Sequence, residues 1–278
     1  GTSFRQALHF MALGFNLHDT MIYEVAGTGA KGSNLAYWQA FEFMFVMSKG
    51  TPATVNRIAD VKNTSGGKPR GFRTKSARLN SRVDRPLVIA PMMSVRPNVW
   101  RYPVGLGDTE DHPAPFPEAL ARDHILSWSN PSDVVLDPMC GSGTTIDVCR
   151  DTGRRALGYD INPVREDIFR ADARRLPLED RKADFVFIDP PYGDNIEYSS
   201  EKDCIGRLNA ADPAYFKAME GVFGEIHRIL RNDRHMALYV SDYYHRKRGF
   251  IPIGSALFGL LSRRFTPVDI ISVTRHNR

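Results

Sequence analysis

The residues best suited to chemistry are the tetrapeptide Asp189-Pro190-Pro191-Tyr192, which follows an apolar run at 185–188. Two consecutive prolines remove backbone donors and fix φ, so the Asp189 side chain and the Pro190 carbonyl are held rigidly beside the Tyr192 ring. Such a pair of acceptors beside an aromatic ring suits a planar amine. Accepting both of its protons favours a pyramidal nitrogen, and stacking on Tyr192 holds the substrate in line. Positioning and charge stabilisation then supply the catalysis, unless the tetrapeptide is a chance sequence in a turn.

A second candidate site is the glycine-rich turn D-P-M-C-G-S-G-T-T at 137–145, between a predicted strand at 134–136 and a helix. Ligands of an open α/β sheet bind where strands end, and the free amides of a helix start accept electronegative groups. The dinucleotide pattern needs a third glycine where Ile146 stands, and the phosphate loop needs a lysine that is absent between Gly141 and Arg150. The turn therefore favours a ligand without phosphates, with a simple tight turn as the alternative.

Two acids follow later strand-like segments. Asp160 ends the predicted strand at 156–159, nineteen residues after Gly141, and an acid there is placed to accept hydrogen bonds from ribose hydroxyls. This position indicates a nucleoside, and the alternative is a surface residue that heads a turn. Asp172 follows a third short segment and is placed to accept from an adenine amino group, with a helix N-cap as the alternative.

Together these motifs resemble those of the amino-methyltransferases that use S-adenosylmethionine, especially the DNA adenine-N6 and cytosine-N4 methyltransferases. Residues 137–145 are similar to the family's D-P-F-x-G-S-G-T-T cofactor motif, with Met139 in place of the usual Phe, and residues 189–192 are similar to its catalytic D-P-P-Y. The resemblance implies methyl transfer to the exocyclic amino group of a base flipped out of double-stranded DNA, with adenine N6 as the leading expectation. Cytosine N4, an RNA amino group and an inactive DNA-binding module are the alternatives.

The resemblance also assigns roles to residues. The implied catalytic residues are Asp189, Pro190, Pro191 and Tyr192. The implied S-adenosyl-L-methionine contacts are Phe116, Asp137, Pro138, Gly141, Ser142, Gly143, Thr144, Asp160, Asn162 and Asp172. Asn195, Tyr198 and Ser199 are candidates for a lip over the base, and residues 241–244 for a further substrate contact. No metal site is expected.

The order of the motifs departs from one family subgroup. Residues 37–50 resemble the late strand of the subgroup whose target-recognition region precedes the cofactor motif, yet here D-P-P-Y follows the glycine turn. We therefore expect a permutation or fusion of two subgroups, joined around 136–145. The segments 4–25 and 253–273 both read as a helix followed by a strand, and they compete for one place in the sheet.

The elements that position these residues alternate along the chain beyond Glu118. Apolar runs at 134–136, 156–159, 185–188, 236–240 and 268–273 read as buried strands, and 120–128, 219–230 and 253–261 read as helices. This pattern predicts a doubly wound, mainly parallel, Rossmann-like methyltransferase sheet, which the resemblance sets at seven strands. We divide the chain into 1–50, a helix and strand pair that completes or flanks the sheet, 51–110, a target-recognition region, and 111–278, the catalytic core.

The composition of the chain bears on its core, its partners and its cellular compartment. The 278 residues are 42% hydrophobic, enough for a sizeable core, and they carry a net charge of +5. Residues 49–86 hold ten Lys and Arg against two Asp, which is +8 in a loop-rich stretch, so we expect DNA contact there, with a solvated linker as the alternative. Three cysteines without a C-x-x-C pair and the lack of a long apolar run favour a cytoplasmic protein without membrane contact. The oligomeric state is left open.

Overall fold

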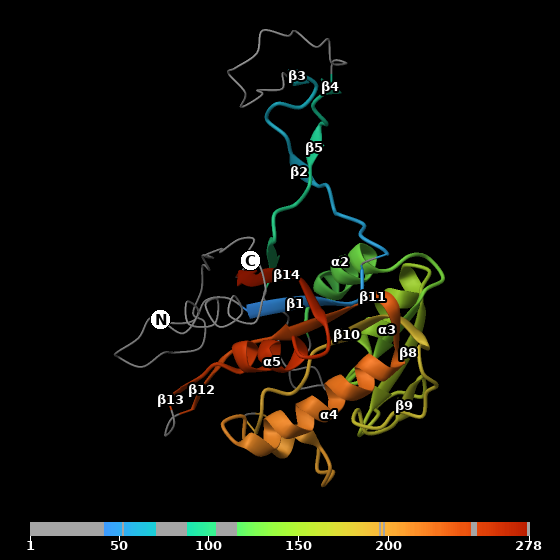
Figure 1. Ribbon diagram of the computed structural model, residues 1–278, viewed down its shortest axis with the longest axis vertical. Coiled ribbons are helices and arrows are strands. Elements are labelled where there is room, and N and C mark those ends of the chain that lie inside the picture. The colour runs from blue at the N-terminus through green and yellow to red at the C-terminus, as the bar shows by residue number, and fades with distance from the viewer. Residues whose placement is uncertain are drawn as a thin grey trace. The chain divides into compact units, whose positions relative to one another are not determined.

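The computed structural model describes residues 42–51, 53–70, 88–103, 116–194, 196, 198–245 and 249–276. The chain divides into two compact units (Figure 1). The large unit comprises the residues up to Asn56 and those from Asn98 onward, and the small unit comprises Arg57–Pro97. The small unit therefore falls inside the region 51–110, for which target recognition stays a prediction.

The large unit is built on one sheet with the strand order β6-β14-β1-β11-β10-β7-β8-β9 (Figure 1). The strands are β6 (Val99–Pro103), β14 (Thr266–His276), β1 (Glu42–Lys49), β11 (Leu230–Val240), β10 (Ala183–Ile188), β7 (Val134–Asp137), β8 (Arg155–Asp160) and β9 (Ile168–Arg170). Only β1 runs antiparallel to its neighbours among these strands. The predicted mainly parallel α/β sheet is confirmed. Within the described residues the sheet has eight strands rather than seven, because β6 pairs with the outer side of β14.

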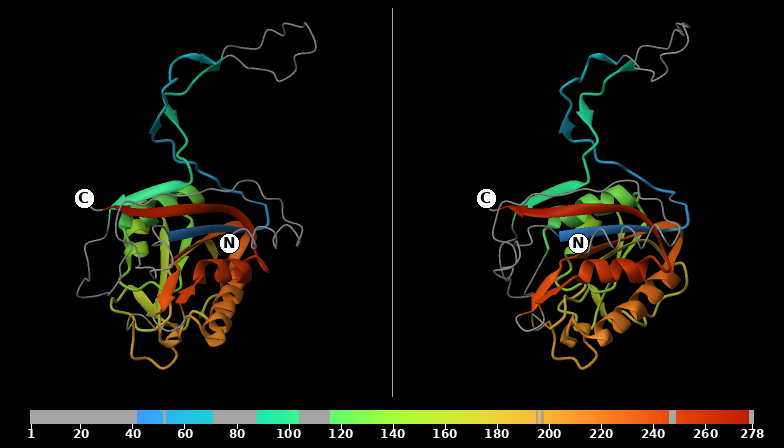
Figure 2. Two further views of the ribbon diagram at one scale, coloured as in Figure 1. Left: turned by 90° about the vertical axis from the view of Figure 1, so that its left-hand side faces the viewer. Right: turned by 60° about the vertical axis from the view of Figure 1, so that its left-hand side comes forward.

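Helices cover both faces of this sheet (Figure 2). The helices α2 (Glu118–Trp128) and α3 (Thr144–Asp151) pack together on one face, and α4 (Pro213–Ile229) and α5 (Ile253–Leu261) on the other. Between them, residues 185–188 of β10 are fully buried, as the apolar run predicted for a central parallel strand. Asp212 begins α4 by accepting a hydrogen bond from the backbone of Ala214, and Pro213 fills the first helical position.

The position next to β1 is occupied by the C-terminal segment. Strand β14 pairs with β1 from Glu42 to Ser48, and α5 packs against the same strand. The competing segment 4–25 lies outside the described residues. One strand from the N-terminal part of the chain is thus built into a sheet whose other strands all come after residue 98.

Lys49 is one of the basic residues counted in the segment 49–86, but its side chain contacts the large unit itself. Its Nζ donates to the backbone carbonyls of His227 at 2.7 Å and Leu230 at 3.0 Å, where α4 ends. Burial, with a smaller contribution from the charge of Arg181, lowers the pKa of Lys49. This lysine therefore joins β1 to the end of α4, and it is not one of the charges exposed for a partner.

The small unit has two short antiparallel strand pairs. Strand β2 (Val61–Lys62) pairs with β5 (Met93–Ser94), and β3 (Pro69–Arg70) pairs with β4 (Val88–Ile89). Among its described residues only Ala90 is fully buried, in agreement with the prediction of a stretch with little core.

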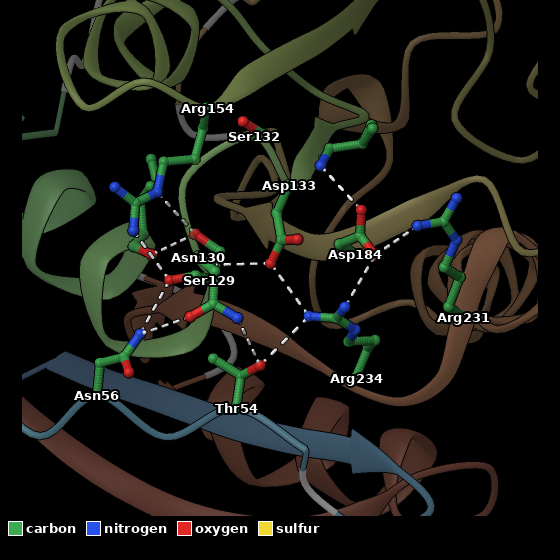
Figure 3. Close-up of polar contacts among 12 residues, drawn as sticks. Thr54, Asn56, Ser129, Asn130, Ser132, Asp133, Arg154, Asp184, Arg231 and Arg234 are labelled. Atoms are coloured by element: carbon green, nitrogen blue, oxygen red, sulfur yellow. Dashed lines mark hydrogen bonds and ion pairs between the residues drawn. The ribbon is translucent and has the colours of Figure 1, made fainter.

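Polar contacts fasten the residues before the small unit to the start of β7 (Figure 3). The amide of Asn56 donates to the carbonyl of Ser129 at 3.0 Å. The buried carboxylate of Asp184 accepts from the backbone N–H of Val134 at 3.0 Å and pairs with Arg234 at 3.3 Å. These contacts fix the first residue of β7, and the other end of β7 leads into the glycine turn.

Candidate functional site

The two predicted motifs lie at the same edge of the sheet. Strands β7 and β10 are parallel neighbours, with Val135 opposite Phe185 and Leu136 opposite Val186, so the turns that follow them end side by side. A cavity of about 280 Å³ lies between these turns. The predicted residues that line it are Phe116, Pro138, Gly141, Ser142, Thr144, Asp160, Asn162, Asp172, Asp189, Pro190, Pro191 and Tyr192. The glycine turn and the tetrapeptide therefore meet in one cavity.

Asp137 is not among the lining residues, although the sequence placed it with the ligand contacts. Its carboxylate is 2% exposed and accepts from the hydroxyl of Thr145 at 2.6 Å and from the backbone N–H of Met139 at 3.1 Å. Burial raises the pKa of Asp137 to about 7, although both hydrogen bonds act in the opposite direction. Asp137 thus links Met139, near the start of the glycine turn, to Thr145 at its end.

Gly143 also lies behind the cavity lining. It precedes α3 with a φ of 91°, and a Cβ at this position would lie 2.5 Å from Nη1 of Arg165. That guanidinium donates to the carbonyl of Ser142 at 3.1 Å and pairs with Asp147 at 2.7 Å. Glycine is needed here both for the backbone conformation and for the close approach of Arg165. The sequence reasoning missed Arg165, because its contact with the turn arises only in the folded chain.

Gly158 supports the same turn from β8. A Cβ on Gly158 would lie 2.6 Å from Cδ1 of Ile146 and 2.9 Å from Sγ of Cys140. The backbone N–H of Cys140 donates to the carbonyl of Tyr159 at 2.9 Å. The missing side chain therefore lets the glycine turn pack directly on β8. A glycine inside a strand pattern is the sequence signal that could have marked this close approach.

Asp160 heads a turn, as one of the two alternatives had it, and it also lines the cavity, so ribose binding stays a prediction. Its Oδ2 accepts from the backbone N–H of Gly141 at 2.9 Å, and its Oδ1 accepts from that of Asn162 at 2.8 Å. The carboxylate therefore shapes its own turn and also holds the glycine turn. Each carboxylate oxygen accepts more than one hydrogen bond, and Asp160 lines the cavity, so it retains capacity for a ligand diol.

Asp172 also lines the cavity, but Arg174 already engages its carboxylate. The guanidinium donates to Oδ1 at 2.9 Å and to Oδ2 at 2.6 Å. Burial alone would raise the pKa of Asp172, but the hydrogen bonds from Arg174 outweigh it and hold the pKa below its usual value. No helix begins at Asp172, so the N-cap alternative is wrong. An amine at this position would have to share the carboxylate with Arg174.

The tetrapeptide is held by contacts to its own side chains and to the following segment. The hydroxyl of Tyr192 donates to Oδ1 of Asp189 at 2.8 Å. Gly193, at φ 84°, turns the chain away, and a Cβ there would lie 2.7 Å from the backbone nitrogen of Ala210. Phe116, from the other side of the cavity, places its ring 5.2 Å from that of Phe187 in β10.

The segment after the tetrapeptide completes the cavity. Tyr198 and Ser199 line it as expected, whereas Asn195 lies outside the described residues. Burial, followed by the charge of Asp189, raises the pKa of Tyr198 to about 12, so this phenol stays neutral at ordinary pH. Residues 241–244 are not among the lining residues. Instead, the carboxylate of Asp242 accepts from the backbone N–H of Gly254 at 2.8 Å in the first turn of α5.

The described residues hold neither a cluster of metal ligands nor a membrane-spanning helix. Cys140, Cys149 and Cys204 are buried free thiols. Within the described residues, no three His, Cys, Asp or Glu side chains gather as metal ligands do. Nor does any helix of those residues combine the length and apolar character required to cross a bilayer.

A model of the N6 and N4 methyltransferase family, described as DNA methylase, matches residues 2–171, more than half of the chain. The chain belongs to this family. The matched span includes the glycine turn and Asp160 and ends before Asp172 and Asp189. The roles of the tetrapeptide therefore rest on its position in the cavity and on its chemistry.

Individual relatives match over parts of their length. The orphan methyltransferase M.BamHII of Bacillus amyloliquefaciens is 43% identical over 176 residues, which cover 60% of this chain and 66% of that protein. The DNA adenine methyltransferase YhdJ of Escherichia coli K12 is 46% identical over 84 residues, 29% of this chain and 28% of that protein. The chain thus spans less than two thirds of these relatives. A TehB-like SAM-dependent methyltransferase from Corynebacterium glutamicum has a TM-score of 0.35 at 16% identity, and the match covers 52% of this chain and 70% of that chain.

Proposed function

We propose that this chain transfers the methyl group of S-adenosylmethionine to the exocyclic amino group of a base in duplex DNA, with adenine N6 as the acceptor. The observation that carries the proposal is the single cavity lined by both the glycine turn and the tetrapeptide. Membership of the N6 and N4 DNA methylase family supports the same chemistry. The name of YhdJ, a DNA adenine methyltransferase, favours adenine.

The cavity fits the proposed cofactor in its donor and acceptor groups. Asp160 lies where β8 ends and would accept from the two ribose hydroxyls, with Asn162 beside it. Pro138, Gly141, Ser142 and Thr144 would contact the cofactor along the glycine turn, and Phe116 would flank its methionine portion. In this arrangement Asp137 and Gly143 act through the shape of the turn. When bound, S-adenosylmethionine supplies an electrophilic methyl carbon whose bond to sulfur breaks as the amino nitrogen bonds to it.

The tetrapeptide would prepare the amino nitrogen. Asp189 and the Pro190 carbonyl would accept hydrogen bonds from the two N–H groups of the amine, which concentrates the lone pair on nitrogen. After methylation, Asp189 would take the one proton that the nitrogen releases. The Tyr192 ring would stack on the base. Flipping the base out of the duplex costs a few kcal/mol, and stacking worth about 1–3 kcal/mol offsets much of that cost. Because Tyr192 donates to Asp189 in the structure, an entering amine shares this acceptor with the Tyr192 hydroxyl.

The small unit would contact the DNA, as part of a target-recognition region at 51–110. Its exposed cations include Arg57, Lys62 and Lys68, whereas Arg96 is paired with Asp60. Its large exposed apolar side chains are Val61, Val88, Ile89, Met92, Met93 and Val95. Positive charge serves the phosphates, and apolar side chains suit contacts with thymine methyl groups in a groove.

The nucleic acid itself is tested by offering duplex DNA and structured RNA with labelled S-adenosylmethionine and identifying the modified nucleoside by mass spectrometry. We expect N6-methyladenine in DNA. Detection of N4-methylcytosine would show that cytosine N4, and not adenine N6, is the acceptor. Methylation of RNA alone would contradict the proposal of a DNA substrate. For the small unit, replacing Lys62 and Lys68 by Gln is expected to reduce the slope of log affinity against log salt by about 2, at roughly 0.9 per phosphate. An unchanged slope would make this unit a linker.

A further inference from the structure

A tyrosine outside the tetrapeptide contacts its backbone. Tyr215 lies in the first turn of α4, and its hydroxyl donates to the carbonyl of Pro191 at 2.9 Å. The residue is fully buried within the main hydrophobic core, and its ring meets that of Phe216 edge to face at 5.3 Å. One end of this side chain is therefore fixed by packing and the other end holds the turn of the cavity.

The two prolines explain why such a contact matters. Pro190 and Pro191 have no N–H, so their backbone can form hydrogen bonds only by accepting them at the two carbonyls. Of these two carbonyls, the proposed function assigns that of Pro190 to the substrate amine. The Pro191 carbonyl belongs to the next peptide unit, and Tyr215 holds it.

The same peptide unit is held on its other side. The plane that contains the Pro191 carbonyl also contains the N–H of Tyr192, and hydrogen bonding from this backbone group acts to lower the pKa of the Tyr198 phenol, against the larger effect of burial. Tyr198 in turn packs so closely on Gly206 that a Cβ there would lie 2.7 Å from its ring. The two polar groups of the peptide between Pro191 and Tyr192 thus interact with two tyrosines, the buried Tyr215 and the half-buried Tyr198.

The protonation state of Tyr215 suits this task. Burial, followed by the neighbouring Tyr198 and the charge of Asp189, raises the pKa of Tyr215 far above its usual value. The phenol therefore remains a neutral donor over the whole working range of pH. It adds no charge beside Asp189 that would compete with the substrate amine.

We infer that Tyr215 is a positioning residue for methyl transfer: its hydroxyl, bonded to the Pro191 carbonyl, fixes the peptide that aims the Pro190 carbonyl and the Tyr192 ring at the substrate. The inference rests on the proposed function for its effect on catalysis. Its structural part, the ordering of the tetrapeptide by one hydroxyl, is measurable without any activity.

The test compares Tyr215→Phe with Tyr102→Phe. Tyr102 lies in β6, is 4% exposed, and donates to a carboxylate oxygen of Asp123 at 2.7 Å, outside the cavity. Both variants delete one buried, hydrogen-bonded hydroxyl and keep the ring. For Tyr215→Phe we expect kcat to fall about tenfold with the Kd of S-adenosylmethionine within about twofold, since small misplacements in a reacting geometry are costly. Tyr102→Phe is expected to leave both unchanged.

Hydrogen exchange supplies the second measurement. In Tyr215→Phe, the amides of the fragment 189–199 are expected to exchange at least about tenfold faster, with no such change in Tyr102→Phe. Unchanged kcat and exchange in Tyr215→Phe would overturn the inference. A loss of cofactor affinity as large as the loss of kcat would also overturn it, because the Tyr215 hydroxyl would then stabilise the whole cavity and not the tetrapeptide in particular. If the wild-type protein methylates no DNA, the proposed function fails, and the exchange comparison still decides whether Tyr215 orders the tetrapeptide.

Discussion

The glycine turn and the tetrapeptide face each other across one cavity, yet different groups anchor them. Carboxylates hold the glycine turn by accepting its backbone N–H groups: Asp160 accepts from Gly141 and Asp137 from Met139. The tetrapeptide offers no N–H at its two prolines, and the phenol of Tyr215 donates to it instead. The first arrangement responds to pH and to any added side chain. The arrangement at the tetrapeptide depends on a neutral phenol hydroxyl, that of Tyr215.

The largest effect on cofactor binding is expected from crowding the glycine turn. Gly143→Ala adds a Cβ 2.5 Å from Arg165 at a φ of 91°, and we expect a loss of about 1–3 kcal/mol in unfolding free energy and at least tenfold weaker S-adenosylmethionine binding. Gly153→Ala is the matched control, because Gly153 has a φ of 71° with nothing within 4 Å of its Cβ. Equal losses in both variants, measured by denaturation and calorimetry, would show that the approach of Arg165 is unimportant.

The ionisation of Asp137 is expected to give a pH-dependent effect on stability. Burial raises the pKa of Asp137 from 3.8 to about 7, so the folded state binds a proton that the unfolded state lacks between these values. Its contribution to stability is therefore complete below about pH 4 and is lost as pH rises to 7. The unfolding free energy of the wild type, relative to Asp137→Asn, should fall by about 1 kcal/mol per pH unit over this range. A difference that stays constant with pH would contradict the assignment.

The smallest effect is expected from the hydroxyl of Tyr192. Tyr192→Phe keeps the ring that would stack on the base and removes only the hydrogen bond to Asp189. Because the stacking surface is unchanged, we expect the transfer rate to change by less than about threefold, with unchanged cofactor affinity. Tyr192→Ala provides the contrast, since it removes the ring as well. A large loss of rate in Tyr192→Phe would move the main role of this residue from stacking to its bond with Asp189.

The sequence was most informative where local pattern decides structure. The fully buried run at 185–188 and the apolar helix at 253–261 were predicted within two residues of their observed bounds, because central parallel strands and buried helices are apolar throughout. The same pattern placed Asp160 and Asp189 at the ends of β8 and β10, the two parallel strands on either side of β7. The strand β6 was not predicted, since a short edge strand has no such signature.

Contacts between distant residues could not be predicted in this way. Tyr215 lies before the predicted helix 219–230, because the observed α4 begins at Pro213, and nothing near it marks a bond to Pro191. Arg165 reads as a surface charge until the fold brings it against Gly143. For Asp137, the motif predicted a ligand contact, but the packing of the turn directs its carboxylate to the backbone of Met139 and the hydroxyl of Thr145.

The central claim is that one turn binds the cofactor and the other activates the amine, so the two functions must separate. Asp189→Ala, with the exposed Asp194→Ala as control, tests this by calorimetry with S-adenosylmethionine and by transfer of labelled methyl groups to duplex DNA. The account predicts that Asp189→Ala binds the cofactor within about twofold of the wild type and loses at least about 99% of the transfer rate, a misplacement-scale effect of 10² or more. Loss of cofactor binding together with transfer, or transfer at the wild-type rate, would contradict it.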